Sequence, residues 1–152
     1  MYCLPEQTRK HHAAAPGPDR PHWTCELHIH QDLHMVGVVR HLLRTALGAR
    51  ASEDFVDVAC LLATEVVGNA LRHGDCSVRV LLRDDGCVLH CAVEDTGPRF
   101  RPASPGPADE LTEGGRGLLL VDACATRWGI RSSPSGTGNQ VWFQLTEHTC
   151  GR

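Results

Sequence analysis

The chain has 152 residues, a length typical of one domain, and its 41% hydrophobic and 22% charged residues are those of a soluble globular protein. Fifteen Lys and Arg against eighteen Asp and Glu leave a net charge of −3, so no global positive field would attract nucleic acid. No apolar run reaches the ~20 residues of a membrane helix, and the N-terminus lacks the apolar stretch of a secretory signal, so we expect a cytoplasmic protein.

The first third of the chain predicts a tail, a strand and a helix. Residues 1–20 mix Pro, Gly, Ala, His and charged residues without a period, which predicts a disordered tail. Apolar and polar residues alternate over 23–29, the pattern of a half-buried strand. Apolar residues then recur every three or four positions over 33–47, which predicts an amphipathic helix with Asp32 as a possible N-cap and Gly48 as its end.

The middle of the chain predicts a buried helix and a hairpin. The helix opens at Ser52, has two carboxylates in its first turn and runs to about His73. Its central part is apolar almost all round, so we expect it to lie deep in the domain. Residues 77–83 and 87–94 then predict two antiparallel strands, joined by the Asp-Asp-Gly turn at 84–86.

The last third predicts a long loop followed by a helix and a second hairpin. Four prolines and two glycines within 96–112 exclude helix and strand there. A loop of this length is typical of a lid or a binding segment. A short buried helix at 118–124 and strands at 126–131 and 140–146 follow.

This order of elements predicts the fold class. We expect an α/β two-layer sandwich, with a mixed, mostly antiparallel sheet and its helices on one face. The domain extends over residues 21–147, and residues 148–152 form a short C-terminal tail.

The eight cysteines contain no Cys-x-x-Cys pair, so most of them are interpreted as small buried hydrophobic residues. Cys87, His90 and Cys91 are an alternative set of zinc ligands. On a strand, however, Cys87 and Cys91 face one side and His90 faces the other, which disfavours that interpretation.

Glu65, Asn69 and His73 have the spacing i, i+4, i+8 and therefore form one polar stripe on the buried helix. A carboxylate at such a place needs an internal partner or a wet cavity. An Asn oxygen suits Mg²⁺, and a Glu one turn away suits a general base, so Asn69 is a candidate metal ligand and Glu65 a candidate catalytic residue. The alternative is a structural hydrogen-bond network.

Asp95 and Gly97 end the strand over 87–94 in an Asp-x-Gly turn. In a functional interpretation the Asp95 carboxylate accepts the exocyclic amine of adenine and Gly97 lets the ring approach the backbone. The alternative is an ordinary turn.

A glycine-rich segment directly precedes the helix at 118–124 and includes Gly114, Gly115, Arg116, Gly117 and Leu118. Converging backbone amides at a helix N-terminus suit phosphate, and Arg116 is a candidate auxiliary contact. The alternative is a flexible hinge with a solvated arginine.

Taken in order, these motifs resemble those of the GHKL (histidine-kinase-like) ATPase superfamily. ATEVVGNALRHG at 63–74, VEDTGP at 93–98 and GGRGLLLV at 114–121 resemble its N, G1 and G2 boxes, and GTGNQVWFQL resembles its last hairpin. Within the superfamily the chain is most similar to the anti-sigma-factor serine/threonine kinases and to actinobacterial stand-alone ATP-binding proteins.

The resemblance implies a Bergerat-type ATP-binding fold with ATP and Mg²⁺ as cofactors. It implies Glu65 as catalytic base, Asn69 as magnesium ligand, Asp95 as adenine contact and Thr137 near the adenine pocket. The function it implies is an anti-sigma regulator that binds a sigma factor, phosphorylates Ser or Thr of an anti-anti-sigma (STAS-type) protein, and often forms a homodimer. A nucleotide-gated protein-binding module without kinase activity is the alternative, and a domain that binds no nucleotide is a third hypothesis.

Overall fold

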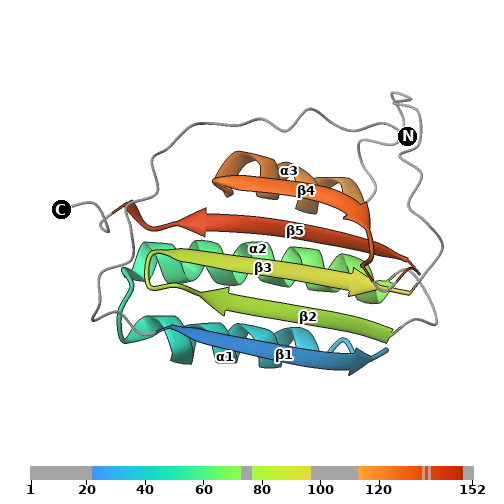
Figure 1. The fold of residues 1–152 in the computed structure, drawn as a ribbon, viewed down its shortest axis with the longest axis horizontal. Helices are drawn as coiled ribbons and strands as arrows, with labels where there is room; N and C mark the ends of the chain where they lie inside the picture. Colours follow the sequence, from blue (N-terminus) through green and yellow to red (C-terminus); the bar gives the residue numbers. More distant parts are fainter. Residues whose placement is uncertain (1–21, 73–76, 97–112, 135, 137, 149–152) are drawn as a thin grey trace.

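Five strands and three helices form two layers in the computed structural model, which describes residues 22–72, 77–96, 113–134, 136 and 138–148, with only the backbone at 113–116 (Figure 1). The elements are β1 (Trp23–His30), α1 (Met35–Gly48), α2 (Glu53–Arg72), β2 (Ser77–Asp84), β3 (Val88–Asp95), α3 (Glu113–Cys124), β4 (Arg127–Ser132) and β5 (Asn139–Thr146). The strands form one sheet in the order β1-β2-β3-β5-β4.

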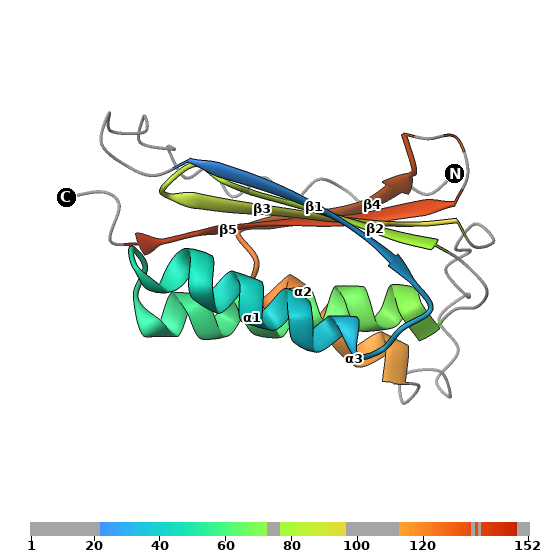
Figure 2. The same ribbon diagram turned by 90° about the horizontal axis from the view of Figure 1, so that it is seen from below.

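All three helices cover the same face of the sheet (Figure 2). The predicted α/β two-layer sandwich is therefore confirmed. The four pairings between described strands are all antiparallel, where the sequence predicted a mixed, mostly antiparallel sheet. The helical pair α1–α2 explains the first pairing. The two helices run antiparallel to each other, so the chain leaves α2 at the end of the molecule where β1 finished, and β2 starts there and runs opposite to β1.

Burial differs between the two long helices as their sequences predict. Eleven of the twenty residues of α2 are buried, whereas α1 buries only Val39, Leu43 and Leu47 on one side. The helix α2 therefore lies at the centre of the helical layer, where an all-round apolar sequence is stable. None of the helices in the described part of the chain has both the length and the apolar character needed to span a membrane.

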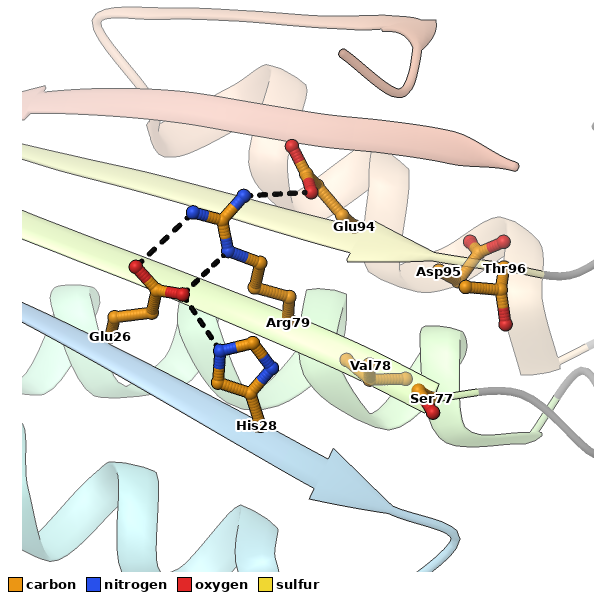
Figure 3. A pocket seen from close by; sticks show the side chains of 8 residues that line it. All are labelled: Glu26, His28, Ser77, Val78, Arg79, Glu94, Asp95 and Thr96. Carbon is orange, nitrogen blue, oxygen red and sulfur yellow. Dashed lines mark hydrogen bonds and ion pairs between the residues drawn. The ribbon is translucent and has the colours of Figure 1, made fainter. Parts of the chain in front are cut away.

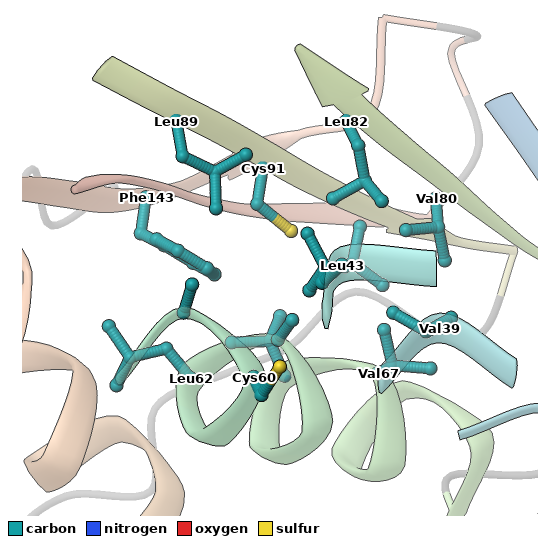
Figure 4. Packing of buried hydrophobic residues seen from close by; sticks show 14 of the residues in the cluster. Val39, Leu43, Cys60, Leu62, Val67, Val80, Leu82, Leu89, Cys91 and Phe143 are labelled. Atoms are coloured by element: carbon teal, nitrogen blue, oxygen red, sulfur yellow. The ribbon is translucent and has the colours of Figure 1, made fainter. Parts of the chain in front are cut away.

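Side chains from α1, α2 and the inward face of the sheet form one hydrophobic core (Figure 4). Leu82 and Leu89 from the sheet and Leu43 and Leu62 from the helices are fully buried in it. Fully burying a leucine side chain contributes about 1.5–3 kcal/mol to stability. The core is mainly aliphatic, with Phe143 as a fully buried aromatic residue.

Three of the five described cysteines are buried, namely Cys60, Cys87 and Cys91, which confirms the interpretation for these residues. Burial raises the pKa of the Cys91 thiol to about 12 and keeps it protonated. Cys124 is exposed on α3, so the interpretation is wrong for that residue. His90 lies on the opposite side of the strand from Cys91, with its Nε2 3.6 Å from Asp85 Oδ2, so the proposed zinc ligands diverge.

The predicted turn between β2 and β3 and the predicted N-cap of α1 have different outcomes. The turn between β2 and β3 forms as predicted, with Gly86 at φ 86° and Asp85 Oδ1 accepting the Val88 N–H at 2.8 Å. Asp32 is not the N-cap of α1, which begins three residues later with His34 as N-cap. Asp32 Oδ1 instead accepts the His34 N–H at 2.9 Å, within the turn that precedes the helix.

A buried ionic cluster anchors the loop between α1 and α2 to the sheet. Arg50 donates through Nε to Asp84 Oδ2 at 2.6 Å and through Nη1 to Glu147 Oε2 at 2.9 Å, and a further bond joins its Nη2 to Asp84 Oδ1. Glu147 Oε1 also accepts the Ser52 N–H at 2.6 Å. The side chains of Arg50, Asp84 and Glu147 are 9%, 0% and 5% exposed, so the charges are removed from water and the guanidinium group partly offsets the two carboxylates.

Candidate functional site

Glu65 and Asn69 lie half-buried on the side of α2 that contacts α3. Their i, i+4 spacing places them one above the other along α2. A Cβ added to Gly117 of α3 would lie only 2.8 Å from Asn69 Nδ2 and 3.1 Å from Glu65 Oε2. The structure thus brings Glu65, Asn69 and Gly117 together, and the glycine leaves room for the ends of the two polar side chains.

The glycine-rich segment before Leu118 is helical and not a loop. The helix α3 begins at Glu113, five residues earlier than predicted, so Gly114, Gly115 and Arg116 belong to its first turns. Packing of α3 against α2 outweighs the low helix propensity of glycine. The segment still offers backbone N–H donors, because the first four N–H groups of a helix have no intrahelical acceptor.

Asp95 is the last residue of β3, and its side chain faces the side of the sheet that the helices cover. It continues the inward-facing series Leu89, Cys91 and Val93, and it pairs across the strands with the buried Val78. The end of β3, the C-terminal end of α2 and the start of α3 lie at the same end of the molecule (Figures 1 and 2). Asp95 and the pair Glu65–Asn69 therefore lie on the same side of the sheet, toward one end of the fold.

Several predicted site residues lie outside the described part of the chain, namely His73, Gly97 and Thr137. Leu118 is half-buried next to Gly117. The structure adds Arg72, which the motif analysis missed although its i, i+3 spacing from Asn69 was visible. Arg72 Nη1 lies 3.5 Å from Asn69 Oδ1, so a cationic group already reaches the oxygen that was predicted to bind a metal ion.

A shallow hollow of about 310 Å³ lies mainly on the opposite face of the sheet (Figure 3). It is lined by Glu26, His28, Ser77, Val78, Arg79, Glu94, Asp95 and Thr96. Arg79 crosses it, donating to Glu26 Oε1 at 2.8 Å and to Glu94 Oε2 at 3.3 Å. Arg79 is already paired with two carboxylates in this hollow, and the sheet separates the hollow from Glu65 and Asn69, so we do not place the candidate site there.

The bonds of Glu26 have a marked electrostatic effect. Hydrogen bonds from Arg79 and His28 lower the pKa of the Glu26 carboxyl from 4.5 to about 2. Because the pKa is lower in the folded state, this pairing favours folding above about pH 4.5 and is lost as the pH falls toward 2. The carboxylate is solvent-exposed, so it stays ionised at neutral pH without implying a catalytic role.

Substitution of Gly117 by Ala tests the packing of α3 against the polar pair. The added methyl group would displace the ends of the Asn69 and Glu65 side chains, which can move at little cost to the fold. Since Ala favours a helix by up to ~1 kcal/mol over Gly, we expect an equal or higher melting temperature. For the Mg·ATP site that the sequence predicts, we also expect the affinity to fall about 10- to 100-fold, because small misplacements of binding groups are costly.

Gly37→Ala is the matched control for that prediction. Gly37 also lies in a helix, α1, and a Cβ there has no neighbour within 4 Å. Thermal melts and calorimetric titration of both variants should show stability maintained in each and nucleotide affinity reduced only in Gly117→Ala. Equal affinities in the two variants would contradict the role given to the contact.

Comparison with known proteins identifies the family. The profile of the histidine kinase-like ATPase domain matches residues 29–145. An uncharacterized protein of Streptomyces coelicolor is 39% identical over 67 residues, which cover 44% of this chain and 63% of that protein. The crystal structure of the RsbU and RsbW domains of Rv1364c from Mycobacterium tuberculosis matches 81% of this chain and 32% of its own, with a TM-score of 0.55 and 21% identity.

The chain belongs to the histidine kinase-like ATPase domain family, because the profile matches most of its length. The match to the mycobacterial structure is below 25% identity and adds the fold alone. It agrees with the antiparallel five-stranded sheet and its one-sided helical layer. The chain spans less than two thirds of either matched protein.

Proposed function

We propose that this chain binds ATP with Mg²⁺ on the helix-covered side of the sheet, between the Glu65–Asn69 pair, the start of α3 and the end of β3. The junction of Glu65, Asn69 and Gly117 carries the proposal, because two polar side chains meet a glycine of the next helix at a half-buried place. Membership of the histidine kinase-like ATPase family supports it independently.

The residues present suit magnesium and a nucleotide. Mg²⁺ prefers oxygen ligands and keeps several waters, so the Asn69 oxygen beside the nucleotide phosphates would suit the ion once Arg72 Nη1, 3.5 Å from that oxygen, moves aside. When bound, the ion neutralises charge on the phosphates. The N-terminal amides of α3 provide donors for phosphate, with Arg116 as an additional contact, and the Asp95 carboxylate accepts the adenine amine.

We further propose that the bound ATP serves an anti-sigma regulator. In this role the protein binds a sigma factor and phosphorylates a Ser or Thr of an anti-anti-sigma partner of the STAS type. Glu65 takes the proton of the hydroxyl group, the hydroxyl oxygen forms a bond to the terminal phosphorus, and the bond from that phosphorus to the bridging oxygen breaks to release ADP. The resemblance of the chain to the anti-sigma-factor kinases within the superfamily and the presence of Glu65 support this role.

Calorimetry with ATP tests the binding proposal. We expect Mg·ATP to bind the wild-type protein, and chelation of Mg²⁺ to weaken binding about 10-fold or more, since the ion bridges protein and phosphates. In Asn69→Ala the affinity should be low with and without Mg²⁺, so that the ion no longer makes a difference. Absence of ATP binding by the folded wild-type protein would refute the proposal.

A nucleotide-gated binding module without kinase activity is the second candidate function. It shares the ATP site but sequesters its partner through conformation alone. Incubation with labelled ATP and candidate anti-anti-sigma proteins separates the two functions. Transfer of label to Ser or Thr supports the kinase, whereas retained ATP binding without transfer to any cognate partner supports the binding module.

A further inference from the structure

Gly138 is in close contact with the end of strand β3. A Cβ added to Gly138 would lie 1.7 Å from the carbonyl oxygen of Asp95, 2.7 Å from its carbonyl carbon and 2.9 Å from Thr96 Cα. All three atoms belong to the main chain, so no side-chain rotation can make room. Only a residue without a side chain fits between this turn and the strand.

Hydrogen bonds hold the turn between β4 and β5 in this position. The Ser133 N–H donates to the Gly138 carbonyl at 3.1 Å, and the Gly136 N–H donates to the Ser133 carbonyl at 3.0 Å. Asn139, the next residue, is the cross-strand partner of Asp95 in the ladder between β3 and β5. The turn is therefore fixed on both sides of the contact, and a larger residue at 138 must displace the Asp95–Thr96 peptide.

A second glycine in the same turn, Gly136, can be compared with Gly138. Gly136 has φ 87° and Gly138 has φ 82°, so both adopt the left-handed conformation that favours glycine. A Cβ on Gly136 meets no atom within 4 Å in the part of the chain that the structure describes. Alanine substitutions at the two positions thus carry a similar backbone penalty, and they differ in the contact with Asp95.

We infer that Gly138 is a positioning residue that directs the Asp95 carboxylate toward the exocyclic amine of the nucleotide base, and so sets base specificity. This inference rests on the proposed ATP site. A carboxylate accepts a hydrogen bond from the 6-amino group of adenine but repels a 6-oxo group, which is itself an acceptor. Such discrimination requires the correct direction of the hydrogen bond, and the direction follows from the backbone position of Asp95.

Titration of ATP and inosine triphosphate, each with Mg²⁺, into wild-type protein, Gly138→Ala and Gly136→Ala tests the inference. Inosine triphosphate carries an oxygen in place of the amine. Because hydrogen bonds to charged groups are the stronger kind, the wild-type protein should prefer ATP about 10- to 100-fold. Gly136→Ala should keep this ratio, and Gly138→Ala should bring it close to one.

The ratio of the affinities for ATP and inosine triphosphate distinguishes a positioning role of Gly138 from a merely structural one. If Gly138 has a merely structural role, Gly138→Ala should weaken the binding of both nucleotides equally and leave the ratio at its wild-type value. That result would overturn the inference. If Gly138→Ala does not fold, as judged by circular dichroism, insertion of one glycine after Gly136 loosens the contact without adding a side chain. That variant should also lose the preference, and an unchanged ratio in it would equally overturn the inference.

Failure of the proposed ATP site would give a different result from failure of the role of Gly138. A folded wild-type protein that binds neither nucleotide refutes the ATP site itself. A wild-type protein that binds both nucleotides equally retains the ATP site and overturns base selection through Asp95, and with it the role of Gly138.

Discussion

Replacement of Glu65 by Gln should slow phosphoryl transfer to the partner protein about 10²- to 10⁴-fold, the usual contribution of a general base. The amide cannot take the proton of the attacking hydroxyl at neutral pH, yet it keeps the size of the carboxylate and its acceptor oxygen. Since the side chain packs against Gly117, a residue of equal size should preserve this contact. We therefore expect the affinity for Mg·ATP to stay close to that of the wild-type protein.

Glu53→Gln is the matched control for that experiment. Glu53 lies on the same helix, α2, but it is exposed in the first turn, far along the helix from Asn69. Rates measured with labelled ATP and affinities measured by calorimetry should be unchanged in this variant. A Glu65→Gln protein that transfers phosphate as fast as the wild-type protein would exclude Glu65 as the base.

Replacement of Arg50 by Met should lower the free energy of unfolding by about 3–5 kcal/mol, the range measured when one partner of a buried ionic pair is removed. The methionine would leave the carboxylates of Asp84 and Glu147 close together and almost fully buried, without their shared cation. It would also remove the guanidinium group that lies 5.5 Å from the centre of the Phe55 ring.

Equilibrium unfolding in urea measures this effect, and Arg44→Met is its control. Arg44 also forms an ion pair, at 2.7 Å with Asp57, but the two side chains are 51% and 55% exposed. Exposed pairs contribute only about 0–1 kcal/mol, so this variant should unfold almost as the wild-type protein does. Similar losses in the two variants would contradict the anchoring role of the buried cluster.

Local patterns in the sequence determined most of the elements of the fold. The alternation over 23–29, the apolar helix after Ser52 and the two hairpins all correspond to observed elements, because side-chain periodicity follows directly from helix and strand geometry. The spacing of Glu65 and Asn69 likewise predicted one polar stripe, since i and i+4 share a helix face. The family, too, was recognised from short motifs whose order is a property of the sequence.

The tertiary structure alone decided which distant residues meet. Arg50 is 34 residues from Asp84 and 97 from Glu147, and no local pattern predicts that they form one cluster. The helical start of α3 at Glu113 arises in the same way, because packing between elements overrides the local preference of glycine for loops. The close contacts of Gly117 with α2 and of Gly138 with the end of β3 also join residues far apart in the sequence. Periodicity determines the face that a residue occupies, but only the folded chain determines what lies against it.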